Sequence, residues 1–259
     1  MAANRIFALI HGVYGVGKTT LGHTLPGPLL VFDTEIASRY VDRPQVIWDP
    51  VEEDVPKAED LTNDTAVIIV CQDWESYRAG MNVLQSGDHP FRSVLIDSLT
   101  ELQKRLKDTL NPVDGLESYS KPDWDVWDQL LVFMEKDVRK LRDLAGPGSR
   151  KPINVCILAA SNVEEAPRRP ILQGALKRSL PGFVDLEGYL RVVKTIDEST
   201  GKEQKRRVLD IDDTSEDSVA EVKCRPPQLA EKYGDSMWDP SFKKILRTIN
   251  PTNKENTDG

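Results

Sequence analysis

Five short apolar runs recur along the first 160 residues, and most of them are continuous rather than interrupted by polar residues at every second position. They cover Ile6–Ile10, Leu29–Phe32, Val67–Cys71, Val94–Ile96 and Ile153–Ala160. Continuous runs of this length are typical of strands covered on both faces, as in a parallel sheet flanked by helices. The pattern therefore predicts an α/β fold with a mostly parallel central sheet.

Two stretches between the fourth and fifth runs carry apolar residues at helical spacing. The first follows Ser98 and has a one-sided stripe at Leu99, Leu102, Leu106 and Leu110. The second begins at Asp123, a candidate N-cap, and keeps its stripe at Trp127, Leu130, Leu131, Met134, Val138 and Leu141 until the Gly146-Pro147-Gly148 sequence. Stripes of this kind predict helices whose apolar side faces the core.

The pattern changes beyond residue 185. Tyr189–Lys194 and Arg207–Ile211 predict two strands joined around residues 199–201, with the basic run KEQKRR in the second half of the hairpin. Val219–Cys224 predicts a further strand, and the polar residues at the C-terminus predict a disordered tail. We therefore expect an antiparallel extension of the sheet over residues 188–225.

The length of 259 residues suits one large domain with extensions. We expect a core over residues 1–230 and a C-terminal segment over residues 231–259. Within the core, residues 49–66 form a predicted acidic insertion, because seven acids and one lysine lie between Asp49 and Asp64. Such a composition favours an exposed, mobile segment. The net charge of −8 argues against simple attraction of nucleic acid to the whole surface.

The chain shows neither a membrane span nor the basic and then apolar layout of a signal peptide. Its three cysteines, Cys71, Cys156 and Cys224, are far apart and without metal-like spacing, so we expect free thiols. Both observations predict a cytoplasmic protein with no membrane partner.

The complete pattern G-x-x-x-x-G-K-[ST] follows the first apolar run, as GVYGVGKTT over residues 12–20. Its place after a strand and before a short helix separates a phosphate-binding loop from a chance glycine-rich turn. Glycines let the backbone turn its N–H groups around an anion, lysine supplies a charge for the β and γ phosphates, and threonine an oxygen for Mg²⁺. The sequence predicts that ATP and Mg²⁺ are bound here. The residues concerned are Gly12, Gly15, Val16, Gly17, Lys18, Thr19 and Thr20.

A second carboxylate is needed at the end of a neighbouring strand, because Mg²⁺ keeps its waters and takes few protein ligands. Asp97 ends the run Val94–Ile96 and is the predicted metal-side acid, with a simple helix cap as the alternative. Glu35 follows the strand that ends in FDTE and is the candidate base that orients the attacking water. The alternative for Glu35 is a solvated loop acid.

The motifs GVYGVGKTT, FDTE, LIDSLTEL and VKCRPPQ occur in the order and approximate spacing of the RecA recombinase core, which this chain resembles motif by motif over residues 5–230. It is most similar to the small phage ATP-binding proteins with a RecA-like core that act as single-strand annealing proteins. The resemblance implies a P-loop NTPase fold in which Lys18 and Thr19 bind phosphate and Mg²⁺, Asp97 is the metal-side acid and Glu35 the general base.

The resemblance also implies roles for two further groups. Lys223 and Arg225 match a cationic pair that RecA-like filaments place against the γ-phosphate of the neighbouring subunit, which would make turnover depend on a homo-oligomer. Two exposed basic residues on an edge strand are the alternative. Asn162 stands where such proteins place a polar γ-phosphate sensor, usually a glutamine, so the sensor role is open.

Residues 163–183 are predicted to form a basic mobile loop, placed where recombinases contact single-stranded DNA. Arg168, Arg169, Lys177 and Arg178 are its candidate DNA-binding residues. A flexible basic segment neutralises backbone phosphates, although no aromatic residue precedes Phe183 to stack on bases. A solvated loop is the alternative.

These features favour an ATP-binding, ATP-hydrolysing protein that binds single-stranded DNA and promotes annealing or strand exchange. We expect it to act as a filament or ring, with a single-strand-binding protein as a further candidate partner. A small-molecule kinase with a phosphate loop is the second interpretation, with the segment from Arg168 to Arg178 as its lid. An AAA+ helicase loader is a third, and it is less favoured because residues 185–225 predict strands where a helical lid is needed.

Overall fold

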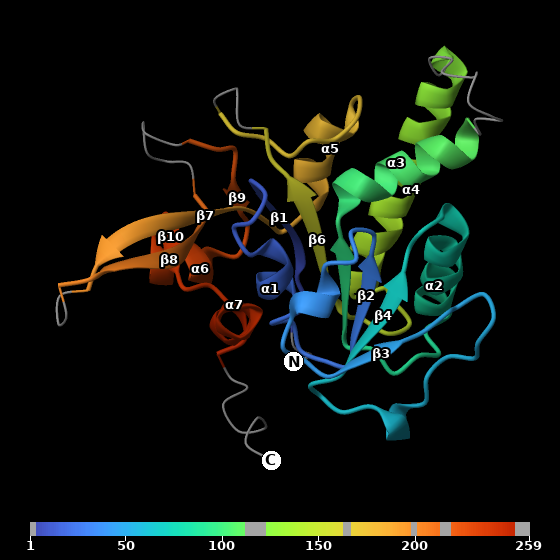
Figure 1. Cartoon of the computed structure of the whole chain (residues 1–259), viewed down its shortest axis with the longest axis horizontal. Coiled ribbons are helices and arrows are strands. Elements are labelled where there is room, and N and C mark those ends of the chain that lie inside the picture. Colours follow the sequence, from blue (N-terminus) through green and yellow to red (C-terminus); the bar gives the residue numbers. More distant parts are fainter. Residues whose placement is uncertain (1–3, 112–122, 163–166, 198–200, 213–218, 252–259) are drawn as a thin grey trace.

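The computed structural model describes residues 4–111, 123–162, 167–197, 201–212 and 219–251. Its centre is a sheet that contains ten strands of these residues, in the order β10-β8-β7-β1-β6-β5-β2-β4-β3, with β9 paired to β7 (Figure 1). The strands are β1 (Phe7–Gly12), β2 (Leu29–Asp33), β3 (Gln45–Ile47), β4 (Ala66–Val70), β5 (Ser93–Asp97), β6 (Asn154–Ala160), β7 (Leu186–Ile196), β8 (Glu203–Asp210), β9 (Lys223–Cys224) and β10 (Ser236–Trp238).

The strands from β7 to β3 run parallel to one another, and each of the five predicted strands is present within one or two residues of its expected bounds. The strand β3 is not among the predicted strands; it is short and lies at the edge of the sheet. The sheet is therefore the mixed α/β arrangement that the apolar pattern predicts.

Helices cover both faces of the sheet. They are α1 (Lys18–Gly22), α2 (Trp74–Ser86), α3 (Leu99–Leu110), α4 (Trp124–Ala145), α5 (Leu176–Phe183), α6 (Pro227–Tyr233) and α7 (Phe242–Ile249). Alternate residues of β1 enter two separate cores: Phe7 and Leu9 pack with residues of α2, α3, α4 and α5, whereas Ala8 and Ile10 pack with residues of α1, α6 and α7. A strand with an apolar core on each side needs apolar residues at every position, which explains the continuous runs.

The two helices predicted from apolar stripes are α3 and α4, and their bounds agree with the pattern. Ser98 caps α3 by accepting a hydrogen bond from the Glu101 N–H at 3.3 Å. The helix α2 is not predicted, although Asp73 caps it at 2.8 Å from the Ser76 N–H and Gly87 ends it in the left-handed region.

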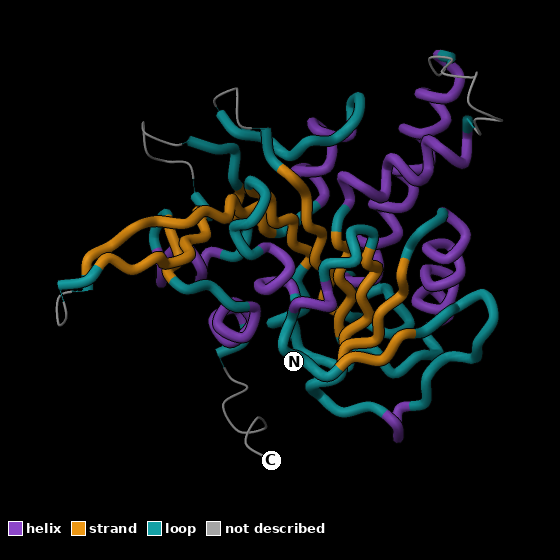
Figure 2. Tube along the Cα trace, viewed as in Figure 1, coloured by secondary structure: helices purple, strands orange, loops and turns teal. Residues whose placement is uncertain are grey.

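The predicted hairpin is β7 and β8, which pair antiparallel over eight positions from Tyr189 to Ile196 and extend beyond the helices (Figure 2). The strand β10 pairs antiparallel with β8, and β9 pairs antiparallel with the start of β7. The predicted strand over Val219–Cys224 is much shorter than expected, because only Lys223 and Cys224 are strand residues. The turn residues 199 and 200 lie outside the described part of the chain.

Three segments differ from their expected character. The second half of the predicted mobile loop 163–183 is the helix α5, which packs on α4, while residues 163–166 lie outside the described residues. The C-terminal segment 231–259 includes β10 and α7, which belong to the sheet and to its second core, and its predicted tail 252–259 is not described. All seven acids of the predicted insertion are exposed, but its last residue, Ala66, begins β4.

Candidate nucleotide site

The phosphate-loop sequence connects β1 to α1 at the carboxyl edge of the sheet. Gly15 and Gly17 have φ angles of 77° and 94°, in the left-handed region that glycine adopts without strain. Gly12 is needed for another reason, because a Cβ there would lie 2.5 Å from the carbonyl oxygen of Leu190 in β7. The loop therefore turns at two glycines and packs on β7 at the third.

The Lys18 ammonium group folds over this loop. Its Nζ donates to the carbonyl oxygens of Gly12 at 2.9 Å and Val13 at 3.0 Å. Burial lowers the pKa of Lys18, and the nearby carboxylates of Glu35 and Asp97 oppose that shift. A positive charge is thus placed over the loop within the field of two acids.

Asp97 ends β5, and its carboxyl group is almost completely buried, at 2% exposure. Burial raises the pKa of Asp97 from its ordinary value of 3.8 to about 7, while a hydrogen bond with Thr19 acts in the opposite direction. The strand β6 lies between β1 and β5, and the helix α1 packs against β6. The helix also lies close to β5, since a Cβ on Gly22 would be 2.7 Å from the Leu95 side chain. Because α1 packs across these strands, its residue Thr19 lies beside Asp97 at the end of β5.

The donor set suits Mg²⁺. The Oδ2 atom of Asp97 is buried without a hydrogen-bond partner in the described structure, and the Thr19 hydroxyl group is beside the same carboxyl group. A buried carboxylate oxygen without a partner is costly unless a cation or water binds it. Hard oxygen ligands of this type are those that Mg²⁺ takes, and few of them come from the protein.

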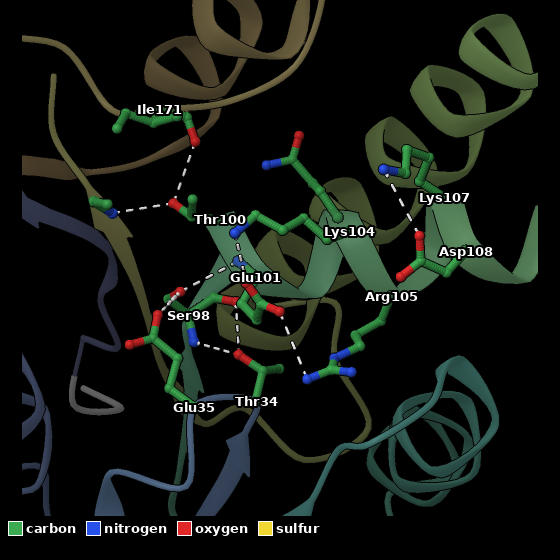
Figure 3. Close-up of polar contacts among 12 residues, drawn as sticks. Thr34, Glu35, Ser98, Thr100, Glu101, Lys104, Arg105, Lys107, Asp108 and Ile171 are labelled. Atoms are coloured by element: carbon green, nitrogen blue, oxygen red, sulfur yellow. Dashed lines mark hydrogen bonds and ion pairs between the residues drawn. The ribbon is translucent and has the colours of Figure 1, made fainter. Parts of the chain in front are cut away.

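Glu35 lies beside Asp97 at the same edge, as predicted, because β2 and β5 are neighbours and Asp33 pairs with Asp97. The Ser98 hydroxyl group donates to Glu35 Oε1 at 2.5 Å, and Figure 3 shows the two side chains pointing toward one another. Thr34 Oγ1 accepts from the Ser98 N–H at 2.9 Å and donates to the Asp97 carbonyl oxygen at 3.0 Å. Glu35 is exposed, and the hydrogen bond from Ser98 holds its carboxyl group in place.

Asp33 has a structural role in this arrangement. Its carboxyl group accepts from the backbone N–H groups of Glu35 at 3.1 Å, Ala37 at 3.2 Å and Ser38 at 2.9 Å. Three such bonds fix the turn that follows β2 and leave Glu35 as the acid available for chemistry at this strand end.

Asn162 follows β6, but its side chain is used by its own loop: Oδ1 accepts from the Arg169 N–H at 2.8 Å. The preceding residue, Ser161, bonds to His11 at 2.8 Å between Oγ and Nδ1, and burial lowers the pKa of His11 to about 4, so this imidazole is neutral. The predicted sensor role of Asn162 stays a prediction.

The four predicted DNA-binding residues fall into two pairs. Arg168 bonds to the Tyr189 hydroxyl group and Arg169 forms an ion pair with Glu221. Lys177 and Arg178 are exposed on α5. The structure therefore places the first pair in contacts within the chain and the second pair on the surface.

Lys223 and Arg225 contact the C-terminal end of α5. Lys223 Nζ donates to the carbonyl oxygens of Pro181 at 2.5 Å and Val184 at 3.3 Å, and Arg225 donates to that of Gly182 at 2.6 Å. Cations at a helix C-terminus donate hydrogen bonds to its last carbonyl groups and interact favourably with the helix dipole. The pair has a structural role within the chain, and its predicted role toward a neighbouring subunit stays a prediction.

One residue at the site was not predicted. Arg207 of β8 donates from Nε to the carbonyl oxygen of Val16 at 3.1 Å, within the phosphate loop. The basic run KEQKRR was the only sequence signal for it, and that signal does not distinguish Arg207 from its neighbours.

The buried carboxyl group of Asp97 leads to a prediction about stability. A carboxyl group whose pKa is raised in the folded state costs stability as the pH rises from its unfolded pKa of about 3.8 to its folded pKa of about 7, because the ionised form is disfavoured only in the folded chain. Asp97→Asn should therefore stabilise the chain without ligand, and by on the order of 2 kcal/mol more at about pH 8 than at about pH 5.

Denaturant unfolding of wild type and Asp97→Asn at both pH values, without Mg²⁺ or nucleotide, measures this difference. The control is Asp128→Asn in α4, at an exposed acid that is not part of the site. An equal gain for Asp97→Asn at the two pH values would contradict the assignment of a raised pKa.

Two comparisons bear on this site. A family model described as "AAA domain" matches residues 4–218, which include the phosphate loop, Glu35, Asp97 and the β7–β8 hairpin. No curated protein matches the chain. In the described parts of the chain, no helix has the length and apolar content needed to span a bilayer.

Proposed function

The chain belongs to the AAA domain family and carries a P-loop ATPase-like domain, and from that premise we propose that it binds ATP with Mg²⁺, hydrolyses it, and couples this turnover to single-stranded DNA. The observation that carries the nucleotide part is the convergence of three groups on one sheet edge: the loop with Lys18, the buried Asp97 and the Ser98-held Glu35.

Each group has a distinct task in this function. The loop amides and Lys18 bind the phosphate chain, and Thr19 and Asp97 are the residues that would hold Mg²⁺, which neutralises phosphate charge when bound. Glu35 accepts a hydrogen bond from the attacking water and takes its proton. The bond from Ser98 orients the Glu35 carboxyl group and leaves its second oxygen for the water.

The DNA part of the proposal is supported by α5. The segment before this helix is fixed to the end of β6, since the Ile171 N–H donates to Ala160 O at 2.7 Å and Thr100 donates to Ile171 O at 3.2 Å. Lys177 and Arg178 are thereby presented on the surface from an element that begins at the nucleotide edge. Exposed cations near this edge are suited to contact backbone phosphates when nucleotide is bound.

The test is the ATPase rate with and without single-stranded DNA at two salt concentrations. We expect DNA to stimulate turnover, and the stimulation to weaken at high salt. Protein binding releases counterions from the DNA, and this release favours binding less when the salt concentration is high. The double variant Lys177→Ala and Arg178→Ala should have a weaker salt dependence. The negative slope of log affinity against log salt should become smaller in magnitude by about 1.4, at ~0.7 for each lost contact with a single strand.

The control variant removes two cations elsewhere, Lys243 and Arg247, which are exposed on α7 at the other face of the sheet. Stimulation by a nucleoside or metabolite and not by DNA would favour a small-molecule kinase instead. Equal DNA affinity in the two double variants would contradict the role of α5.

A further inference from the structure

Arg207 lies against the phosphate loop, although 191 residues separate it from Val16 in the sequence. Besides the bond to Val16 O, its guanidinium group fills the space beside Gly17: a Cβ on Gly17 would be 2.9 Å from Arg207 Cζ. Gly17 therefore meets two requirements at once, a left-handed backbone and room for this side chain.

The backbone of Arg207 is fixed from both sides. Its residue pairs with Val192 across the β7–β8 hairpin, and its carbonyl oxygen accepts from the Asp239 N–H at 2.8 Å, just after β10. The residue is exposed, but its backbone is bonded to β7 on one side and to the residue after β10 on the other. The position of the guanidinium group is thus a product of the antiparallel part of the sheet.

The bond to Val16 O acts on a single peptide group. The peptide between Val16 and Gly17 is trans, so its C=O and N–H point in opposite directions. A cation at the oxygen therefore leaves the Gly17 N–H on the side away from Arg207 and makes it a stronger donor by polarising the peptide. Backbone N–H groups of a phosphate loop are the groups that bind the anion.

We propose that Arg207 is a positioning residue of the phosphate site, which orients the Val16–Gly17 peptide and adds positive charge outside the loop, so that nucleoside polyphosphates bind more tightly. This inference rests on the proposed binding of ATP. It concerns the phosphate chain, because the contacts of the Arg207 side chain described above are with Val16 and Gly17 of the loop.

The adjacent Arg206 provides a matched control. It lies on the other face of β8, where its Nε bonds to Asp239 at 3.0 Å and its guanidinium group lies 5.0 Å from the Trp238 ring centroid. Removing Arg206 takes the same charge from the same strand without touching the phosphate loop.

The experiment measures the affinity of the full chain for ATP, and competition by inorganic pyrophosphate, in wild type, Arg207→Ala, Arg207→Lys and Arg206→Ala. We expect Arg207→Ala to weaken ATP and pyrophosphate by the same factor, about tenfold, and to lower the salt dependence of both. Arg207→Lys should fall between wild type and Arg207→Ala, because lysine keeps the charge but loses the fixed Nε donor. Arg206→Ala should bind as wild type does.

Thermal unfolding without ligand shows whether each variant is folded. If Arg207→Ala does not fold, the comparison of Arg207→Lys with wild type and Arg206→Ala tests the proposal instead. Equal affinities of Arg207→Ala and Arg206→Ala would overturn the proposal, as would a loss of ATP affinity without a matching loss for pyrophosphate. If wild type itself bound no ATP, the proposed function would fail, and this outcome is distinct from normal binding that is insensitive to Arg207.

Discussion

Lys18→Ala is expected to weaken ATP binding by about a hundredfold or more and thereby to abolish turnover at ordinary ATP concentrations. The physical reason is the position of its Nζ, which is held over the loop by the Gly12 and Val13 carbonyl oxygens. Burial already disfavours the charged form of this group, so an anion that enters the loop gains a partly desolvated cation. Titration calorimetry with a slowly hydrolysed ATP analogue measures the effect.

The fold should survive this change. Lys18 is only partly buried, and the two bonds that are lost go to the carbonyl oxygens of residues five and six positions earlier, so a change of a few degrees in the unfolding temperature is expected. Lys140→Ala is the matched control: Lys140 is an exposed lysine of α4 that pairs with Asp137 at 3.0 Å, on a helix that carries no residue of the site. ATP affinity equal to wild type in a folded Lys18→Ala chain would refute the assignment of the nucleotide site.

Glu35→Gln is expected to leave ATP binding nearly unchanged and to slow hydrolysis by about 10² to 10⁴, the usual contribution of a positioned general base. Glutamine keeps the shape of the side chain and an oxygen that accepts from Ser98, but it cannot take a proton from water. Single-turnover hydrolysis at saturating ATP separates the chemical step from binding.

Glu101→Gln is the control for this prediction. Glu101 lies in the first turn of α3, close to Ser98, but its carboxyl group is engaged with Lys104 and Arg105, at 2.8 Å and 3.6 Å (Figure 3). Its neutralisation should leave hydrolysis at the level of wild type. If Glu35→Gln hydrolysed ATP as fast as Glu101→Gln, the base would have to be sought elsewhere on this edge.

The positions of the loop glycines and of the two acids were largely predictable, because they depend on short stretches with strict backbone requirements. Gly15 and Gly17 mark the left-handed positions of the loop, and Asp97 and Glu35 each follow an apolar run with the length and composition of a buried strand. Since the carboxyl ends of parallel strands share one edge, these residues were expected to meet once the sheet was recognised. The helices α3 and α4 were predictable for a similar local reason, because their apolar residues recur at helical spacing.

Contacts between distant segments were decided only by the tertiary structure. Arg207 reaches the phosphate loop because β7 pairs parallel with β1 and antiparallel with β8, an order of strands that the apolar pattern does not contain. The same holds for Lys223 and Arg225: the resemblance predicts a role toward a neighbouring subunit, and only the structure shows that within the chain they contact the last carbonyl groups of α5.

By itself, then, the sequence determined the parallel strands, the glycine-rich loop after the first of them and the two acids at the same sheet edge, since each depends on neighbouring residues and on one general rule about sheet edges. The tertiary structure decided which basic residues contact the loop and which contact other parts of the fold. A positive charge has no directional signature in a sequence, and its role depends on the oxygen atoms that folding brings within about 3 Å of it.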